Sequence, residues 1–191
     1  GMLLIALALP LSASQFLELP FDQLAVESQY IVRGQILETW SAWDDAHEVI
    51  FTYATVRVSR YFGETTGPDL LVIREAGGTV DGYTQEAIGF PMIRRGEDVV
   101  LMLAPWENGA ELRIHGYNQG KFLVKNRGGR EVLVADSVRQ GDERLGRNGD
   151  IPNVQTEAAD DAPALGLDEF AAMVEDARAG KGSRLPNLER Q

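Results

Sequence analysis

One short stretch of the chain gathers side chains that could hold a metal ion. Asp44, Asp45, His47 and Glu48 lie within five residues, and His47 is one of only two histidines. Carboxylates and an imidazole are common ligands of divalent metals. The spacing matches no calcium-binding loop, however, and aspartates are frequent in turns because their side chains accept hydrogen bonds from nearby backbone amides. The stretch therefore predicts a turn. If the protein binds a metal ion, these four residues are the candidate ligands.

Other catalytic motifs are missing. The chain has no cysteine, which excludes thiol nucleophiles, disulfide bonds and cysteine-bound zinc. Gly77, Gly78 and Gly82 form no phosphate-binding loop, because no Lys-Ser/Thr pair that opens a helix follows them. His115 lies in an expected strand without a partner evident from the sequence. We assign no catalytic residue and expect no cofactor, and the residues favour a protein that is not an enzyme.

A carboxylate-dependent hydrolase or lyase is the alternative. It would use either Asp44, Asp45 and Glu48 or the pair Asp81 and Glu86, since paired carboxylates can act as general acid and base. Such an enzyme should have carboxylates that converge in a concave pocket with perturbed pKa values. An interaction module should instead have a flat, exposed apolar patch.

Aromatic residues border the first expected hairpin and are the main binding candidates. In an OB-type barrel, exposed rings at this place can stack on bases or sugars, although packing in the core or over the barrel rim is the other role open to them. The long glycine-rich loop that follows, residues 77–96, adds further candidates. The binding set is Trp40, Trp43, Phe51, Tyr53, Gly78, Asp81 and Tyr83.

The net charge limits the choice of partner. The chain carries 29 acidic and 18 basic residues, a net charge of −11. Such a surface repels phosphate backbones and anionic lipid. Nearby Arg33, Arg57 and Arg60 offer little compensation. We therefore expect no nucleic-acid partner, and a single-stranded nucleic-acid-binding OB-fold is kept only as an alternative.

Alternation of apolar and polar residues indicates an all-β fold. The clearest run, residues 48–60, places Ile50, Ala54 and Val56 on one side of a long strand. Gly34 in the preceding strand, residues 30–40, suggests a bend or a close crossing of backbones. With further strands at 70–76, 98–105, 111–116, 119–126 and 132–136, the expected fold is an OB-like barrel of five to six strands. A short N-terminal helix at 20–28 and a C-terminal amphipathic helix complete it.

The chain divides by composition into five parts. Residues 1–14 contain an apolar run that ends in small residues and is too short to span a bilayer. The run is typical of a signal-peptide remnant, although its basic n-region is missing; a hydrophobic element packed on the domain is the alternative. Residues 15–136 are the barrel domain, 137–166 an irregular acidic segment, 167–180 the helix and 181–191 a polar tail. We expect an exported protein, periplasmic or secreted, whose mature chain is not inserted in a membrane.

A distinctive order of motifs runs from residue 20 to 125, with a glycine and a proline at Gly89 and Pro91, the pair Gly96-Glu97, and the run 119–122. This order resembles a family of uncharacterised bacterial exported proteins. Met92 and Ile93 depart from the family pattern, which usually has an aromatic residue there. The resemblance implies an OB-like barrel similar to tissue inhibitors of metalloproteinases and netrin-type modules. Those inhibitors chelate the protease metal through an N-terminal cysteine, which this chain lacks, so no activity follows from the resemblance. Its most specific residues are Gly89, Pro91, Gly96, Glu97 and the run 119–122.

Together these observations predict a non-enzymatic, exported interaction module. Its partner would be a protein or a glycan, and the sequence leaves the oligomeric state open. The acting surface would be the first hairpin and the loop at 77–96. The outward side of the strand at 48–60, with Phe51, Tyr53 and Thr55, is too apolar for plain exposure to water. Either the C-terminal helix or a partner should cover it.

Overall fold

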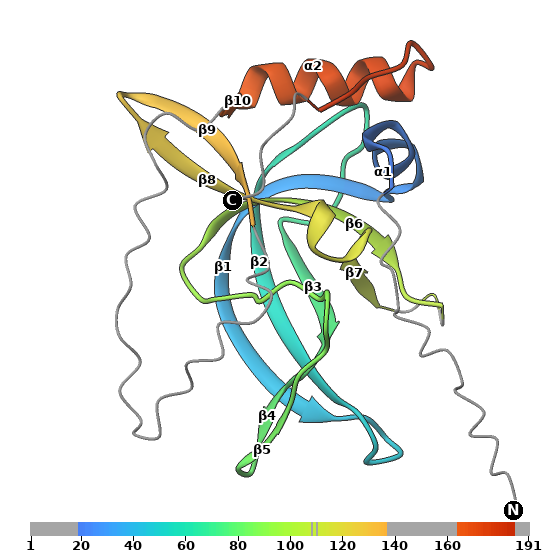
Figure 1. Cartoon of the computed structure of the whole chain (residues 1–191), viewed down its shortest axis with the longest axis vertical. Coiled ribbons are helices and arrows are strands. Elements are labelled where there is room, and N and C mark those ends of the chain that lie inside the picture. The colour runs from blue at the N-terminus through green and yellow to red at the C-terminus, as the bar shows by residue number, and fades with distance from the viewer. Residues whose placement is uncertain (1–18, 108, 110, 137–163, 186–191) are drawn as a thin grey trace, which may run out of the picture.

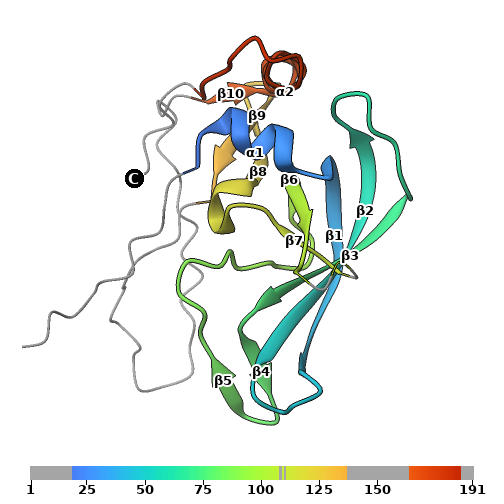
Figure 2. The ribbon, with the colours of Figure 1, turned by 90° about the vertical axis from the view of Figure 1, so that its right-hand side faces the viewer.

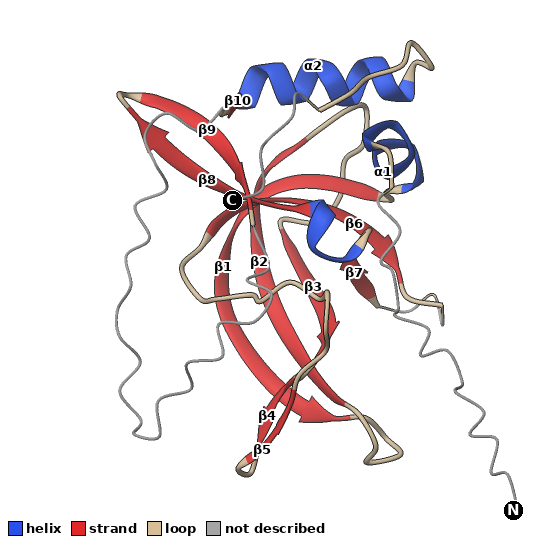
Figure 3. Cartoon of the chain, viewed as in Figure 1, coloured by secondary structure: helices blue, strands red, loops and turns tan. Residues whose placement is uncertain are grey.

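The structure, a computed structural model, describes residues 19–107, 109, 111–136 and 164–185. Strands predominate in this part of the chain (Figure 3). The elements in order are α1 (Phe21–Glu27), β1 (Tyr30–Trp43), β2 (Ile50–Tyr61), β3 (Leu70–Ala76), β4 (Gly78–Val80), β5 (Tyr83–Gln85), β6 (Asp98–Pro105), β7 (Leu112–Ile114), the 3₁₀ turn η1 (Tyr117–Gly120), β8 (Lys121–Arg127), β9 (Arg130–Ala135), β10 (Leu165–Gly166) and α2 (Leu167–Arg178).

Five of the strands close into a barrel in the order β1-β2-β3-β7-β6, because β6 also pairs with β1 (Figure 1). The neighbours are antiparallel except β3 and β7, which run parallel and meet at the single pair Ile73 and Leu112. β8, β9 and β10 continue the sheet beyond β6. The expected all-β barrel is thereby confirmed.

Gly34 allows β1 to curve around the barrel. The register of β1 against β2 shifts between Arg33 and Gly34 and again between Ile36 and Glu38. A Cβ atom on Gly34 would lie 2.6 Å from the carbonyl oxygen of Arg57, closer than real Cβ atoms approach backbone. Only glycine fits at this crossing, which confirms the close approach that the sequence suggested.

Two hydrophobic cores lie on opposite sides of the curved sheet. The first fills the barrel and consists of Val32, Ile36, Ala54, Val56, Leu71, Ile73, Val99, Leu101, Leu103 and Ile114. The second lies between the outer side of the sheet and the two helices. Its members include Phe21, Leu24, Ile31, Phe62, Val100, Met102, Phe122, Leu133, Phe170 and Val174.

The C-terminal helix belongs to the second core. The ring of Phe170 meets those of Phe21, Phe62 and Phe122 edge-on, with centroids 5.3 to 5.8 Å apart. At the other end of α2, Arg178 donates hydrogen bonds to backbone carbonyl oxygens of α1 and its flank. Figure 2 shows both helices beside β6, β8 and β9, with β3 farther from them. Only the last residues of β2, 57–60, lie near the start of α2, where they line a common groove. The helix therefore does not cover the outward side of β2.

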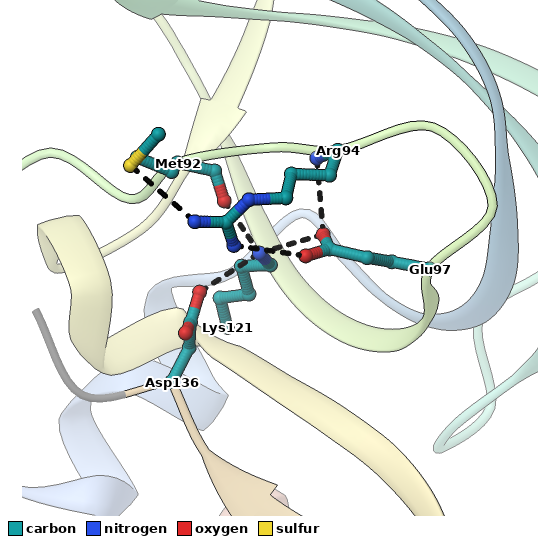
Figure 4. Close-up of polar contacts among 5 residues, drawn as sticks. All are labelled: Met92, Arg94, Glu97, Lys121 and Asp136. Carbon is teal, nitrogen blue, oxygen red and sulfur yellow. Dashed lines mark hydrogen bonds and ion pairs between the residues drawn. The ribbon is translucent and has the colours of Figure 1, made fainter. Parts of the chain in front are cut away.

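A buried lysine holds the end of the loop before β6 (Figure 4). The side chain of Lys121 is fully buried, and its Nζ lies 2.8 Å from both Glu97 Oε2 and Asp136 Oδ2. It also donates to the carbonyl oxygen of Met92. Glu97 in turn accepts a hydrogen bond from the backbone amide of Arg94. Two carboxylates thus compensate one buried ammonium group, and the loop is fixed to β8 and to the end of β9.

Three segments differ from the sequence-based outline. β1 continues to Trp43, the loop at 77–96 contains the β4–β5 hairpin, and Leu165–Gly166, expected to be irregular, pair with β9. The amide of Ser183, in the expected tail, donates to Asp22 at 2.6 Å. The signal-peptide remnant and most of the acidic segment lie outside the described residues. Within the described residues, no helix is long and apolar enough to cross a membrane.

Candidate functional site

The outward side of β1, β2 and β3 forms a surface that we call the three-strand face. The antiparallel register aligns its side chains in rows across the strands. In one row Trp40 lies beside Tyr53, which lies beside Arg74; in the next, Thr55 lies beside Val72. The face consists of Glu38, Trp40, Ala42, Phe51, Tyr53, Thr55, Arg57, Leu70, Val72 and Arg74.

The three-strand face exposes several large apolar side chains among polar ones. Trp40 stacks on Tyr53 with ring centroids 5.4 Å apart and planes inclined by 8°. Trp40 is 42% exposed, Val72 50% and Leu70 55%. Large apolar side chains that lie together and remain this exposed are typical of interaction surfaces.

One end of the face is held rigidly by Arg74. Its guanidinium group lies 4.2 Å from the centroid of the Phe51 ring and 5.2 Å from that of Trp106. Trp106 Nε1 donates a hydrogen bond of 2.8 Å to the carbonyl oxygen of Arg74, and Glu111 forms an ion pair with the guanidinium group. Cation–π contacts of this kind contribute about 0.5–2 kcal/mol each. Arg74 therefore has little freedom to move.

The structure separates the sequence-based binding candidates into two groups. Trp40, Phe51 and Tyr53 lie on the three-strand face. Trp43 pairs with Ile50 on the opposite side of the hairpin, where its ring stacks on His47 and meets the exposed ring of Tyr83.

Two further candidates have local backbone roles. Asp81 adopts a positive φ of 50° in the tight turn between β4 and β5. Gly78 lies so close to Ser41 and Thr52 that a Cβ atom would meet their hydroxyl groups at 2.5 and 2.6 Å. The candidates therefore do not form one continuous surface, because successive residues of a strand point to opposite sides.

The acidic turn after β1 is stabilised from within. Asp44 Oδ1 accepts hydrogen bonds from the backbone amides of Glu48 and Val49 at 2.7 and 3.0 Å. These bonds lower the pKa of Asp44 below its usual value. No group of three or more histidine and carboxylate side chains in the described part of the chain is arranged to hold a metal ion. The carboxylate of Asp44 thus stabilises the turn by accepting backbone hydrogen bonds.

A groove of about 720 Å³ runs beside the three-strand face, between β1, β2 and the start of α2. Arg33, in its lining, donates to both Asp98 and Glu131 at 2.6 to 3.2 Å. The hydrogen bonds to Glu131 and then Asp98 raise the pKa of Arg33, and the bond from Arg33 lowers that of Glu131. Both carboxylates are thus held in ion pairs with one arginine.

Among the described residues, the carboxyl group with the most strongly raised pKa lies elsewhere, in the barrel. Glu75 on β3 is 2% exposed, and burial raises its pKa to about 8. It is not among the residues that line the groove. A catalytic carboxylate would combine an unusual pKa with access to a substrate, and Glu75 has only the first of these.

Ser28, His115 and Glu27 resemble a catalytic triad in composition. Ser28 Oγ lies 3.3 Å from His115 Nδ1, and His115 Nε2 lies 3.5 Å from Glu27 Oε2. The Ser28 hydroxyl is buried, however, and donates its proton to the carbonyl oxygen of Leu24 at 2.6 Å. Burial lowers the pKa of His115, so it is neutral at physiological pH. The arrangement ends α1 and joins it to the barrel.

No family model matches the chain, and neither a curated protein nor a solved structure matches it.

Sequence reasoning missed the contribution of β3 and of the β6–β7 connection to the face. The alternation in residues 70–76 assigns Leu70, Val72 and Arg74 to one side of a strand, so their shared side could have been found. That this side continues the side of Tyr53, and that Trp106 packs against Arg74, depends on strand pairing. The sequence does not contain a signal for that pairing.

Proposed function

We propose that this chain is a non-enzymatic, exported interaction module that binds a protein partner through the three-strand face. The observation that carries the proposal is the exposure of three large apolar side chains on this one face, Trp40, Leu70 and Val72. Both helices belong to the second core, which covers the outer side of the sheet at β6, β8 and β9 rather than at this face.

The barrel topology supports an OB-like fold. The strand order β1-β2-β3-β7-β6, with antiparallel neighbours and one parallel contact between β3 and β7, follows the Greek-key pattern of a small five-stranded barrel. OB-type barrels bind ligands on the face of their second and third strands, and β2 and β3 contribute most of the three-strand face. Export is proposed from the apolar run at residues 2–14 alone.

The chemistry of the face favours a protein over a glycan. Binding energy at protein interfaces is concentrated in tryptophan, tyrosine and arginine, often on rigid, well-packed side chains. Trp40, Tyr53 and Arg74 lie in one row, and Arg74 is already held by Trp106 and Glu111. Leu70 and Val72 add aliphatic surface, which a sugar rich in hydroxyl groups would not use.

The two alternatives have less support in the described residues. A hydrolase or lyase needs carboxylates free to transfer protons, but Asp98 and Glu131 of the groove are held by Arg33. Single-stranded nucleic acid needs a basic stripe to neutralise phosphate. On the three-strand face Arg74 is neutralised by Glu111, and the whole chain has a net charge of −11.

Site-specific photo-crosslinking tests the proposal. A photoreactive amino acid replaces Thr55 at the centre of the face or, as a matched control, the exposed Val26 on α1. Both proteins are incubated with the envelope and secreted fractions of the source cells. We expect position 55 to crosslink to a defined protein that position 26 does not reach. The captured protein is then purified and its Kd measured for wild type, Trp40→Ala and Val26→Ala.

Two outcomes would contradict the proposal. The first is a captured protein whose Kd is unchanged by Trp40→Ala. The second is the absence of face-specific crosslinking together with binding of the wild-type chain to a glycan array, which would assign the face to a glycan.

A further inference from the structure

The barrel has one weak seam, where β3 meets β7. The two strands are joined by the single parallel pair Ile73 and Leu112, whereas β1 and β2 pair over almost their whole length. Closure at this seam therefore depends on contacts other than the backbone ladder.

Side chains of β3 and of the β6–β7 connection bridge the seam on both sides. Inside the barrel, Glu75 Oε1 accepts a hydrogen bond of 2.5 Å from the backbone amide of Ile114. Outside, Glu111 pairs with Arg74, and Trp106 Nε1 donates to the Arg74 carbonyl oxygen. Glu75 is the buried member of this set.

The surroundings of Glu75 give an ionised carboxyl group little stabilisation. Its Oε2 has no hydrogen-bond partner among the described residues. On β2 the residue opposite is Thr52, whose hydroxyl donates to the Gly77 carbonyl oxygen. Arg113, next to β7's Ile114, is the charged group that acts on Glu75, and its influence is smaller than that of burial and of the Ile114 hydrogen bond. Arg74, its neighbour on β3, is paired with Glu111 on the outside.

We propose that Glu75 is a proton-dependent latch: the β3–β7 seam is closed while its carboxyl group is protonated and opens locally when it ionises. An ionised Glu75 in the closed seam is a buried charge that Arg113 compensates only in part. Opening exposes the carboxylate to water and breaks one backbone pair, the polar contacts of Glu75, Arg74 and Trp106, and the ring and apolar contacts at the seam. Local opening thus relieves the charge with fewer lost contacts than global unfolding requires.

Amide hydrogen exchange of the full chain tests the latch. The closed seam raises the pKa of Glu75 to about 8, whereas an open seam returns it to the ordinary value of 4.5. The opening equilibrium at residues 112–114, relative to β2, should therefore rise roughly 30-fold between about pH 6.5 and about pH 9.5. Because β2 is measured in the same molecule, the intrinsic pH dependence of exchange cancels.

Variants assign the effect to Glu75. Glu75→Gln keeps an oxygen for the Ile114 amide but cannot ionise, so the rise should disappear. Glu86→Gln removes an exposed carboxyl group and should leave the rise unchanged. Parallel exchange of residues 112–114 and β2 at every pH, or an equal rise in Glu75→Gln, would overturn the latch.

A direct titration replaces the variant if Glu75→Gln does not fold. The carboxyl carbon-13 shift of Glu75 in the wild-type chain then gives the midpoint of its ionisation. The latch requires this midpoint to coincide with that of the change in exchange; a separate midpoint would overturn it.

Discussion

Two regions of the sheet's outer surface differ in what covers them. On the side of β6, β8 and β9, Val100, Met102 and Phe122 are buried under α1 and α2. On the side of β1, β2 and β3, Trp40 and Val72 remain exposed. The covered side is rich in phenylalanine and aliphatic residues, and the open side combines aromatic rings with threonine and arginine. This mixed composition suits contact with water as well as with the protein partner proposed above.

The largest effect is expected on the covered side, at Phe170. Its ring contacts three other buried phenylalanines, and truncation of such a ring costs about 3–5 kcal/mol through lost burial and the cavity left behind. Phe170→Ala should lower the free energy of unfolding in urea by this amount. A loss below about 1 kcal/mol would mean that α2 does not stabilise the barrel.

A somewhat smaller loss is expected at Lys121, beneath the loop before β6. Lys121→Met keeps the length of the side chain but leaves Glu97 and Asp136 without their shared cation. Removal of one partner of a buried ion pair costs about 3–5 kcal/mol, and partial exposure of both carboxylates argues for the lower end. Denaturation in urea measures the loss. Asp136→Asn, which leaves Glu97 in place, should cost less, and an equal cost would contradict the shared arrangement.

The covered side should also respond to acid through His115. Because burial lowers its folded-state pKa below 6.5, the unfolded chain takes up a proton first as the pH falls. Stability should therefore decrease as the pH drops from about 6.5, until the folded-state pKa is reached. Unfolding curves of wild type and His115→Gln at about pH 7 and about pH 5 measure the difference. If the free energy of unfolding falls equally between the two pH values in both proteins, another group is responsible.

The smallest change in stability is expected on the open side. Trp40→Ala removes an exposed ring and should alter the free energy of unfolding by less than about 1 kcal/mol. For the partner proposed above, the same change should weaken binding and raise the Kd by about tenfold or more. A large loss of stability would instead show that Trp40 stabilises the fold. The covered and the open regions would then differ less than proposed.

Local sequence patterns predicted most of the strands. Alternation assigned Ala54 and Val56 to the barrel interior, and both are fully buried. The glycine at position 34 marked the place where β1 crosses close to Arg57. The register shift after Ile36 and the extension of β1 to Trp43 were not predicted, because the residues near a turn carry no strict alternation.

The candidate site was predicted only in part. Trp40, Phe51 and Tyr53 were chosen as bordering one hairpin, and they do share a face. Trp43 was chosen on the same ground but lies on the opposite side, since it follows Trp40 by three positions, an odd number, along the strand. Trp106 and Arg74 were missed because they lie 32 residues apart and meet only after β3 and β6 have joined the barrel.

Side-chain order along the chain was enough to define two sides for each strand and an apolar stripe on the last helix, because these depend on spacing within one element. Which side of β2 would stay open depended on where α2 docks, and that was decided by long-range packing of Phe170 against Phe21, Phe62 and Phe122. The same holds for Glu75 and Lys121. Each looks like an ordinary surface charge in the sequence, and each is buried only because strands distant in the chain close around it.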